Sequence, residues 1–445
     1  MKIDRLFFLI IFISLLLLTS NGCVHHNLPG QSTQRLLGKK ISTLMYDDKS
    51  RHEIPKDPAG IIIFPQVIEL ALKKNPDLSI FSLEIRASES EALQASLLSN
   101  PEVDIEMNNI SSYGKNETTI WLGQLIELGG KINRRTKLAK LDSDLAVWDY
   151  KAKKLEVLTE AVKAFSAVIS AQERLKLHKE LVSLSEKFLN SVNRRIKAGK
   201  VSPAESSRAL VELSISRIEL EKSRNELNAC RHRLSAVWGS LEPKFEKVMG
   251  SLGILTSLPS FSKLKTFVDQ NPDIARWAVE IEQRKINLEL QKAGKIPDPT
   301  VRGGYARSND TGENSFQLSV SVPIPIFNLN QGAIEVAEIR LEQANKQIEA
   351  ISVKLLSQLK ELYNLLSSAH QEVLTLKNKT IPEANNAYKL IDKYYIQGKY
   401  SFIDVLYARR TLFEVKARYL VSLQDYNKYI ADIERLIGQR LDKIK

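Results

Sequence analysis

The sequence predicts a mostly α-helical chain with a small β part, built from two halves that follow the same plan. Three observations indicate this fold. The second half repeats the first, apolar residues recur every seven positions over long stretches, and short segments alternate apolar with polar residues. Apolar heptads are typical of coiled-coil helices, and alternation is typical of strands with one apolar face. We therefore expect each half to run helix, strand, strand, very long helix and long helix.

The internal repeat is clearest at two glycine-containing segments. Ile196–Lys200 (Ile-Lys-Ala-Gly-Lys) matches Tyr395–Lys399 (Tyr-Ile-Gln-Gly-Lys), an offset of 395 − 196 = 199 residues. A unit of this length is too long for a solenoid repeat. It predicts a duplicated half-molecule, with repeats at 61–240 and 260–440, and favours a ring or tube over an enzyme with one cleft. Further matching pairs are Ser202 with Ser401, Glu205 with Asp404 and, at a slightly shorter offset, Asn75 with Asn271.

Residues 1–22 have the features of an export signal. Lys2 and Arg5 precede an apolar run of about a dozen residues, which is too short to cross a bilayer. Small residues lead up to Cys23, where a lipoprotein signal places its acylated cysteine. We expect cleavage before Cys23, lipid attachment to it, and a tether or extended wrap over 23–60. The mature chain is therefore expected outside the cytoplasm.

The composition gives no sign of catalysis or of nucleic-acid binding. The 445 residues carry a formal charge of +12, but Lys and Arg are interspersed with Asp and Glu along helical faces. No phosphate-binding loop, nucleophile elbow, zinc spacing or carboxylate pair stands out. His25-His26 lack a third ligand, so we interpret them as part of the tether, and Cys230 is expected to be a packed free thiol. We expect no metal, no cofactor and no nucleic-acid partner.

Glycine and proline bound the expected elements. Gly199 and Gly398 are expected to end helices in left-handed backbone, and Ser202-Pro203 to start the next helix. The expected helices cover 65–98 (interrupted at Asn75-Pro76), 132–197, 203–239, 272–295, 330–397 and the segment after Gly398. The expected strands cover 103–108, 118–126, 301–307 and 315–322.

The strands have the length needed to cross an outer membrane as part of a β-barrel. Four strands cannot close a barrel, and open sheet edges in lipid leave backbone groups unpaired. Copies of the chain are therefore expected to pool their strands. The alternative is a soluble β-sandwich. The export signal, and helices that reach roughly 100 Å at 1.5 Å per residue, favour a membrane barrel continued by a helical tube.

Three segments resemble the TolC-like outer membrane efflux family, and in particular its CzcC/CusC-type branch from heavy-metal efflux systems. Gln124–Lys131 resembles the first strand-to-helix junction, Val322–Gly332 the second, and Tyr395–Leu406 the helix-turn-helix at the periplasmic tip. The resemblance implies a homotrimer whose four strands per chain form one β-barrel, continued by a coiled-coil α-barrel. It also implies an outer membrane channel that conducts heavy-metal cations from an inner-membrane pump of the RND type and a periplasmic adaptor.

The resemblance places a gate at the two glycine turns. Asp404 matches an acidic residue that rings the family's constriction, and Tyr407 stands where some relatives have a second acid. Negative charges that converge near an axis disfavour anions and attract cations. Tyr395 matches a tyrosine that latches the gate and Glu205 matches its acidic partner, so we expect a hydrogen bond between them in the closed state. The alternative is that Asp404 only stabilises the first turn of its helix.

The same turns are where adaptors dock in the family, which implies docking roles for Gly199, Lys200, Gly398 and Lys399. Within the channel class, the cargo could instead be drugs, organic compounds or a peptide of a type I secretion system. The main alternative of another class is a periplasmic coiled-coil scaffold without transport. A scaffold, however, has no need for four strands of membrane length.

Overall fold

The computed structural model describes residues 57–444, apart from 109–116, 254, 256 and 309–310. The expected export signal (1–22), Cys23, His25-His26 and most of the expected tether lie outside the described residues. In this part of the chain, none of the helices combines the length and the apolar composition that a bilayer-crossing helix needs.

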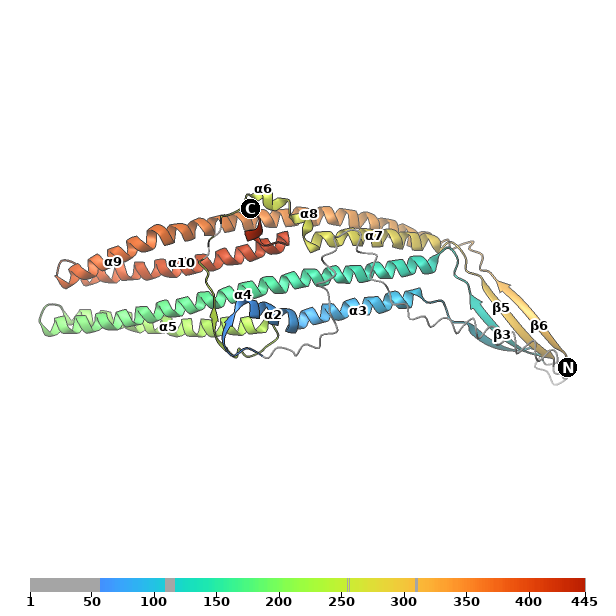
Figure 1. Cartoon of the computed structure of the whole chain (residues 1–445), viewed down its shortest axis with the longest axis horizontal. Coiled ribbons are helices and arrows are strands. Elements are labelled where there is room, and N and C mark those ends of the chain that lie inside the picture. The colour runs from blue at the N-terminus through green and yellow to red at the C-terminus, as the bar shows by residue number, and fades with distance from the viewer. Residues whose placement is uncertain (1–56, 109–116, 254, 256, 309–310, 445) are drawn as a thin grey trace. The chain divides into compact units, whose positions relative to one another are not determined.

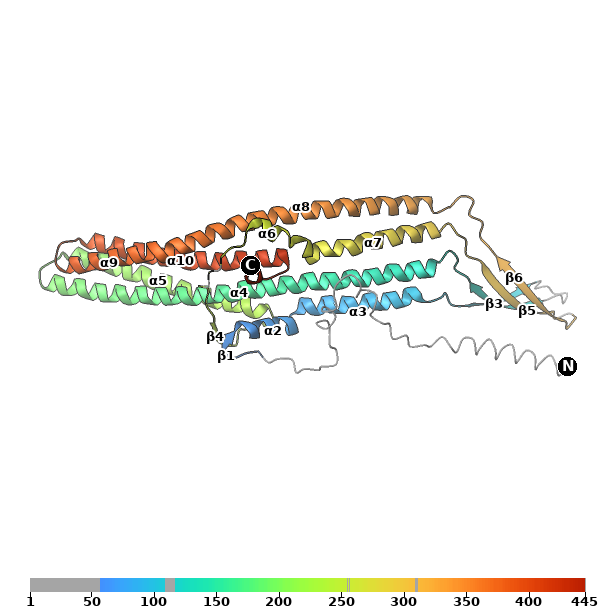
Figure 2. The same cartoon turned by 45° about the horizontal axis from the view of Figure 1, so that its top comes forward.

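The predicted plan of two equivalent halves is confirmed, and Figures 1 and 2 show both halves running side by side. The first half comprises α2 (Phe64–Lys74), α3 (Pro76–Ser96), β2 (Glu102–Asn108), β3 (Glu117–Leu125), α4 (Lys131–Lys197) and α5 (Pro203–Ala236). The second comprises η4 (Val268–Gln270), α7 (Pro272–Ala293), β5 (Thr300–Ser308), β6 (Asn314–Ser321), α8 (Gln331–Thr375), η5 (Leu376–Thr380), α9 (Ile381–Ile396) and α10 (Phe402–Ile437). The 67 residues of α4 correspond to a helix of about 100 Å.

The prediction of one uninterrupted helix over 330–397 is wrong in one detail. Leu376–Thr380 forms a π-helical segment between α8 and α9. Pro382 follows it in the first turn of α9 and has no N–H to donate to the carbonyl four residues earlier. A π segment is a common local solution where the regular hydrogen-bond ladder is interrupted.

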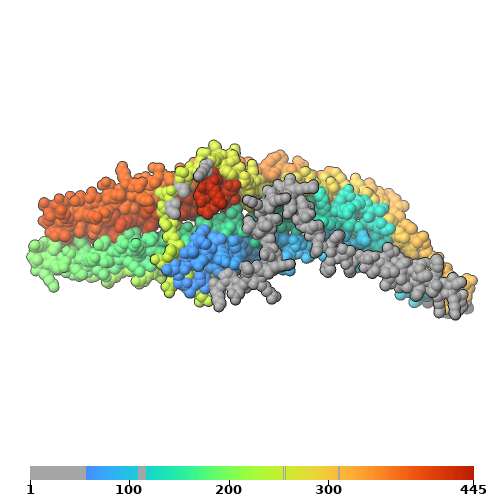
Figure 3. All heavy atoms as spheres, in the orientation of Figure 1, coloured from blue at the N-terminus to red at the C-terminus, as the bar shows by residue number. Residues whose placement is uncertain are grey.

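The structure also contains a parallel pair of short strands that was not predicted from the sequence. β1 (Gly60–Ile63) pairs with β4 (Phe245–Met249). The tether expected over 23–60 therefore ends where a strand begins, because Gly60 is already paired with Phe245. The remaining short elements are α6 (Phe261–Lys265) and η6 (Leu441–Lys443). Figure 3 shows the linker that contains β4 and α6 running across the helices.

The repeated Asn-Pro-Asp motif has the same role in both halves. Asn75 accepts a hydrogen bond from Leu78 N–H at the start of α3 and donates one to Val237 O at the end of α5, at 2.7 Å. Asn271 likewise caps α7 and donates to Leu436 O in α10, at 2.9 Å. Both asparagines are buried. Each asparagine therefore fastens the start of the helix that precedes the strands, α3 or α7, to the end of the last helix of its half, α5 or α10.

The four repeat strands form one antiparallel sheet in the order β2-β3-β5-β6. Opposed residues share a face, because side chains alternate along each strand. One face is apolar and each of these side chains is exposed: Val103, Ile105, Met107, Ile120, Leu122, Phe316, Leu318 and Val320. The other face carries mostly polar side chains: Asp104, Glu106, Thr119, Trp121, Arg302, Gln317 and Ser319. The predicted alternation is confirmed, with the apolar face pointing away from the chain's own core.

We expect Gly304→Ala to destabilise this sheet. An added Cβ would lie 2.6 Å from the ring of Trp121, which is held by a hydrogen bond from its indole N–H to Glu106. Overpacking of this kind costs about 1–3 kcal/mol of unfolding free energy. Thermal unfolding of the detergent-solubilised protein should show a lower midpoint. The matched control is Gly303→Ala, where the added Cβ has no neighbour within 4 Å; equal effects of both substitutions would contradict this packing.

Candidate functional site

Two helical hairpins, α4–α5 and α9–α10, bring their turns to the same end of the bundle, opposite the sheet (Figure 1). Gly199 has φ 68° and Gly398 has φ 79°, the left-handed backbone that glycine adopts without strain. The N–H of Lys200 donates to Arg195 O and that of Lys399 to Tyr394 O, which closes both turns in the same way. All four residues of the expected docking turns, Gly199, Lys200, Gly398 and Lys399, are exposed.

The structure brings Tyr395 and Glu205 together across the two hairpins. The Tyr395 hydroxyl donates a hydrogen bond to Glu205 Oε2 at 3.2 Å. Arg195, in the last turn of α4, completes the contact: its guanidinium lies 4.2 Å from the centre of the Tyr395 ring and donates to Tyr395 O at 3.1 Å. One tyrosine therefore contacts a cation and an anion of the neighbouring hairpin.

Apolar packing surrounds this polar contact. Tyr395 is buried, and it clusters with one residue from each of the other hairpin helices and a second from α10: Val192, Ala209, Phe402 and Val405. Burial, reinforced by the negative charge of Glu205, raises the pKa of Tyr395 to about 12. The phenol is therefore a neutral hydrogen-bond donor throughout the physiological pH range.

Asp404 lies at the start of α10 in a capping box. Ser401 N–H and the Ser401 hydroxyl both donate to Asp404 Oδ2, at 2.8 and 2.7 Å. These hydrogen bonds lower the pKa of Asp404, which keeps the carboxylate charged. The helix-capping role considered from the sequence is therefore present, and it leaves the carboxylate partly exposed at the tip. Tyr407, one turn further along, is 67% exposed.

Two arginines at the tip were missed by the sequence reasoning. Arg195 gave no signal, because it is one of several basic residues at the end of a long helix. Arg409 did give a signal: it lies four residues after buried Val405 and three before buried Leu412. A basic residue at a position that continues an apolar stripe is expected to lie in the packed interface, and Arg409 does so.

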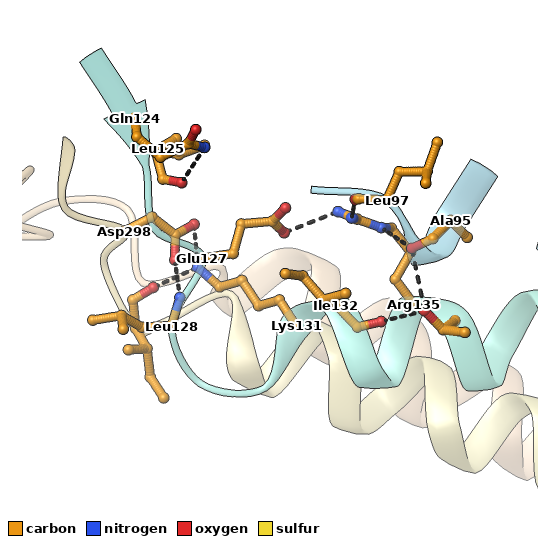
Figure 4. A network of polar contacts seen from close by, with 12 residues as sticks. Ala95, Leu97, Gln124, Leu125, Glu127, Leu128, Lys131, Ile132, Arg135 and Asp298 are labelled. Atoms are coloured by element: carbon orange, nitrogen blue, oxygen red, sulfur yellow. Dashed lines mark hydrogen bonds and ion pairs between the residues drawn. The ribbon is translucent and has the colours of Figure 1, made fainter. Parts of the chain in front are cut away.

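At the other end of the helices, a polar network joins the sheet to the bundle (Figure 4). Asp298, just before β5, accepts from Leu128 N–H at 2.8 Å and pairs with Lys131 Nζ at 2.7 Å. Arg135 of α4 pairs with Glu127 at 2.9 Å and donates to two carbonyls at the end of α3, those of Ala95 and Leu97. The junction therefore ties α3, α4 and the second hairpin of the sheet together, which positions the strands relative to the helices.

The chain belongs to the outer membrane efflux protein family, whose model matches residues 67–240 and 264–439. The family gives the class of the protein: an outer membrane efflux channel, which is a transport component and not an enzyme. Members of this family are the outer membrane components of tripartite efflux systems, which also contain an adaptor and a pump.

The chain is similar to particular members of heavy-metal resistance systems. The chain is 29% identical to the cobalt-zinc-cadmium resistance protein CzcC of Cupriavidus metallidurans, over 86% of this chain and 92% of the relative. It is 25% identical to the nickel and cobalt resistance protein CnrC of the same organism, over 65% of this chain and 70% of the relative. Its fold is similar to that of CusC, with a TM-score of 0.73 at 16% identity over 84% of this chain and 92% of CusC.

We expect the Tyr395 phenol to ionise near pH 12, well above the ordinary tyrosine value of about 10. Because the pKa is raised in the packed state, the contact is at full strength below about pH 10 and is lost as the pH rises through 12. The check is the phenolate absorbance of the native protein minus that of Tyr395→Phe, recorded against pH. A difference signal that develops fully near pH 10 would show that the phenol is not held as described.

Proposed function

We propose that the protein is a homotrimeric channel that passively conducts heavy-metal cations from an RND-type pump and a periplasmic adaptor through the outer membrane. The assignment of heavy-metal cations as the cargo rests on the match to the cobalt-zinc-cadmium resistance protein CzcC, over 86% of this chain and 92% of the relative. The nickel and cobalt resistance protein CnrC supports the same class of cargo. In this proposal the metal ion is the substrate that passes through, and the chain needs no cofactor.

The sheet supports the homotrimer. Its apolar face is exposed, as Leu318 (79%) and Phe316 (69%) illustrate, and such a face suits lipid. Strands β2 and β6 lie at the two edges of the sheet. In lipid each edge needs a partner strand, because unpaired backbone groups cost several kcal/mol each. Three copies would pair β2 of one chain with β6 of the next and close a barrel of about twelve strands.

The tip supports a gate. Three copies of Asp404, each charged and partly exposed at the start of α10, would form an acidic ring that favours cations over anions. Tyr407 in place of a second acid leaves a single ring. The Tyr395–Glu205 hydrogen bond joins the two hairpins and would hold the closed state. The exposed turns at Gly199-Lys200 and Gly398-Lys399 would receive the adaptor.

The proposal extends to the N-terminus and to the two repeats. Removal of residues 1–22 would leave Cys23 as the first residue, with a lipid anchor on its thiol and a tether over 23–60 leading to the first repeat. The two repeats at 61–240 and 260–440 would each contribute two strands to the barrel and one hairpin to the tube.

The cargo is tested by deleting the gene in its host and measuring growth against metal ions and drugs. We expect lower tolerance of Co²⁺, Zn²⁺ or Cd²⁺ and more of that metal retained in the cells, with both restored by the wild-type gene. Unchanged metal tolerance together with lower tolerance of drugs or organic solvents would overturn the metal assignment and favour the alternative cargo. If no transport phenotype appears and the purified protein does not conduct, the scaffold alternative is favoured.

We expect Asp404→Asn to reduce the selectivity of the channel for cations. The substitution keeps the size of the side chain but removes three charges from the proposed ring, so the ratio of cation to anion permeability should fall several-fold. Reversal potentials in planar bilayers under a salt gradient measure this ratio. Glu349→Gln, at an exposed position of α8, is the matched control and should leave the reversal potential unchanged. An unchanged reversal potential in Asp404→Asn would limit Asp404 to its capping role.

A further inference from the structure

Arg409 is a charged side chain buried between the two hairpins. It lies on α10, and only 4% of its side chain is exposed. Its guanidinium lies 5.4 Å from the centre of the Phe188 ring of α4 and 3.6 Å from Glu212 Oε2 of α5. It therefore contacts both helices of the neighbouring hairpin, a little over one turn along α10 from the Asp404 cap.

The contacts of Arg409 do not satisfy its charge. The 3.6 Å separation from Glu212 is longer than a hydrogen bond, and Arg409 Nη1 is buried with no hydrogen-bond partner among the described residues. Glu212 is 41% exposed, so water also weakens this ion pair. Asp392 and Tyr388 of α9, on Arg409's own hairpin, are the other titratable groups close enough to interact with it.

Burial of this charge opposes the packing around it. A buried charge is costly unless it is paired and fully hydrogen-bonded. Consistent with this, burial lowers the pKa of Arg409 in spite of the acidic groups nearby. The same interface is held together by the apolar cluster around Phe402 and by the Tyr395–Glu205 hydrogen bond. If the hairpins separate, these stabilising contacts are lost, but Arg409 regains water.

We propose that the buried charge of Arg409 keeps the closed tip only marginally stable, so that a modest force from a docked partner is enough to separate the hairpins. The inference rests on the proposed function, because it assigns the gate to these two turns. It differs from a simple ion-pair tie in its sign: in this proposal the Arg409 charge favours opening, whereas a tie would favour closure.

The test replaces Arg409 by a side chain of similar length without charge, Arg409→Met, in the full-length protein. Arg410→Met is the matched control, because Arg410 is the next residue and is 76% exposed in a pair with Glu414 of the same helix. Spin labels on Lys200→Cys and Lys399→Cys report the separation of the two turns, with labelled protein diluted into unlabelled protein. Cys230 is buried, and the acylation proposed for Cys23 blocks its thiol.

We expect Arg409→Met to raise the ratio of closed to open turns by about tenfold, because replacing poorly paired buried charges by apolar groups is commonly stabilising. Arg410→Met should leave the ratio unchanged. Glu212→Gln should lower the ratio in the wild-type background and have little effect in the Arg409→Met background. An unchanged or lower closed fraction in correctly folded Arg409→Met protein, as judged by its thermal unfolding, overturns the inference. If Arg409→Met does not fold, an unchanged closed fraction in Glu212→Gln overturns it.

Conductance in planar bilayers separates this inference from the proposed gate. If Arg409→Met closes the turns and also lowers the open probability, both the inference and the gate are supported. If it closes the turns without any change in conductance, the role of Arg409 in the hairpin contact stands, but the gate lies elsewhere in the channel.

Discussion

The constraint on which the rest of this structure depends is a sheet that one chain cannot complete. Each chain supplies four strands, with an apolar face that points away from its own core and two edge strands that lack outer partners among the described strands. An apolar face exposed to water is unfavourable, and edge strands in lipid leave backbone N–H and C=O groups without hydrogen-bond partners. In the proposed homotrimer, copies of the chain join edge to edge in the membrane, which pairs the edge strands and turns the apolar face toward lipid. The helices of the three chains would then lie around the same axis, and a channel would follow from the geometry of the barrel.

Duplication uses the main structural connections of this arrangement twice. Asn75 and Asn271 make equivalent caps, and Gly199 and Gly398 make equivalent turns. The two halves differ where they meet different surroundings. In the first turn of the second hairpin helix, Glu205 of one repeat accepts the Tyr395 hydrogen bond, whereas its counterpart Asp404 caps its own helix. A duplicated acid has therefore acquired two roles, one between hairpins and one at an exposed helix start.

The sequence was sufficient for the features that depend on local periodicity. Heptads predicted the long helices, alternation and the turns between strands predicted the four repeat strands, and glycine marked both turns. The resemblance to relatives paired Tyr395 with Glu205, residues that are 190 positions apart. The β1–β4 pair could not be predicted in this way, because strands of four and five residues are too short to show a periodicity of their own. Arg195 was missed for a related reason: a single arginine among several shows its contact only when the opposite hairpin is in place.

The tip combines interactions of opposite sign, and the proposed gate depends on this combination. Apolar packing and the Tyr395–Glu205 hydrogen bond favour contact between the hairpins, whereas the poorly paired charge of Arg409 opposes it. With the apolar packing and the hydrogen bond alone, a closed tip would need a large input of free energy to open. A buried charge in the same interface reduces the free-energy difference between the closed and the open tip, and it leaves in place the contacts that define the closed tip. Because Arg409 and the Tyr395–Glu205 hydrogen bond lie on the same two hairpins, a partner that separates the turns would act on both at once.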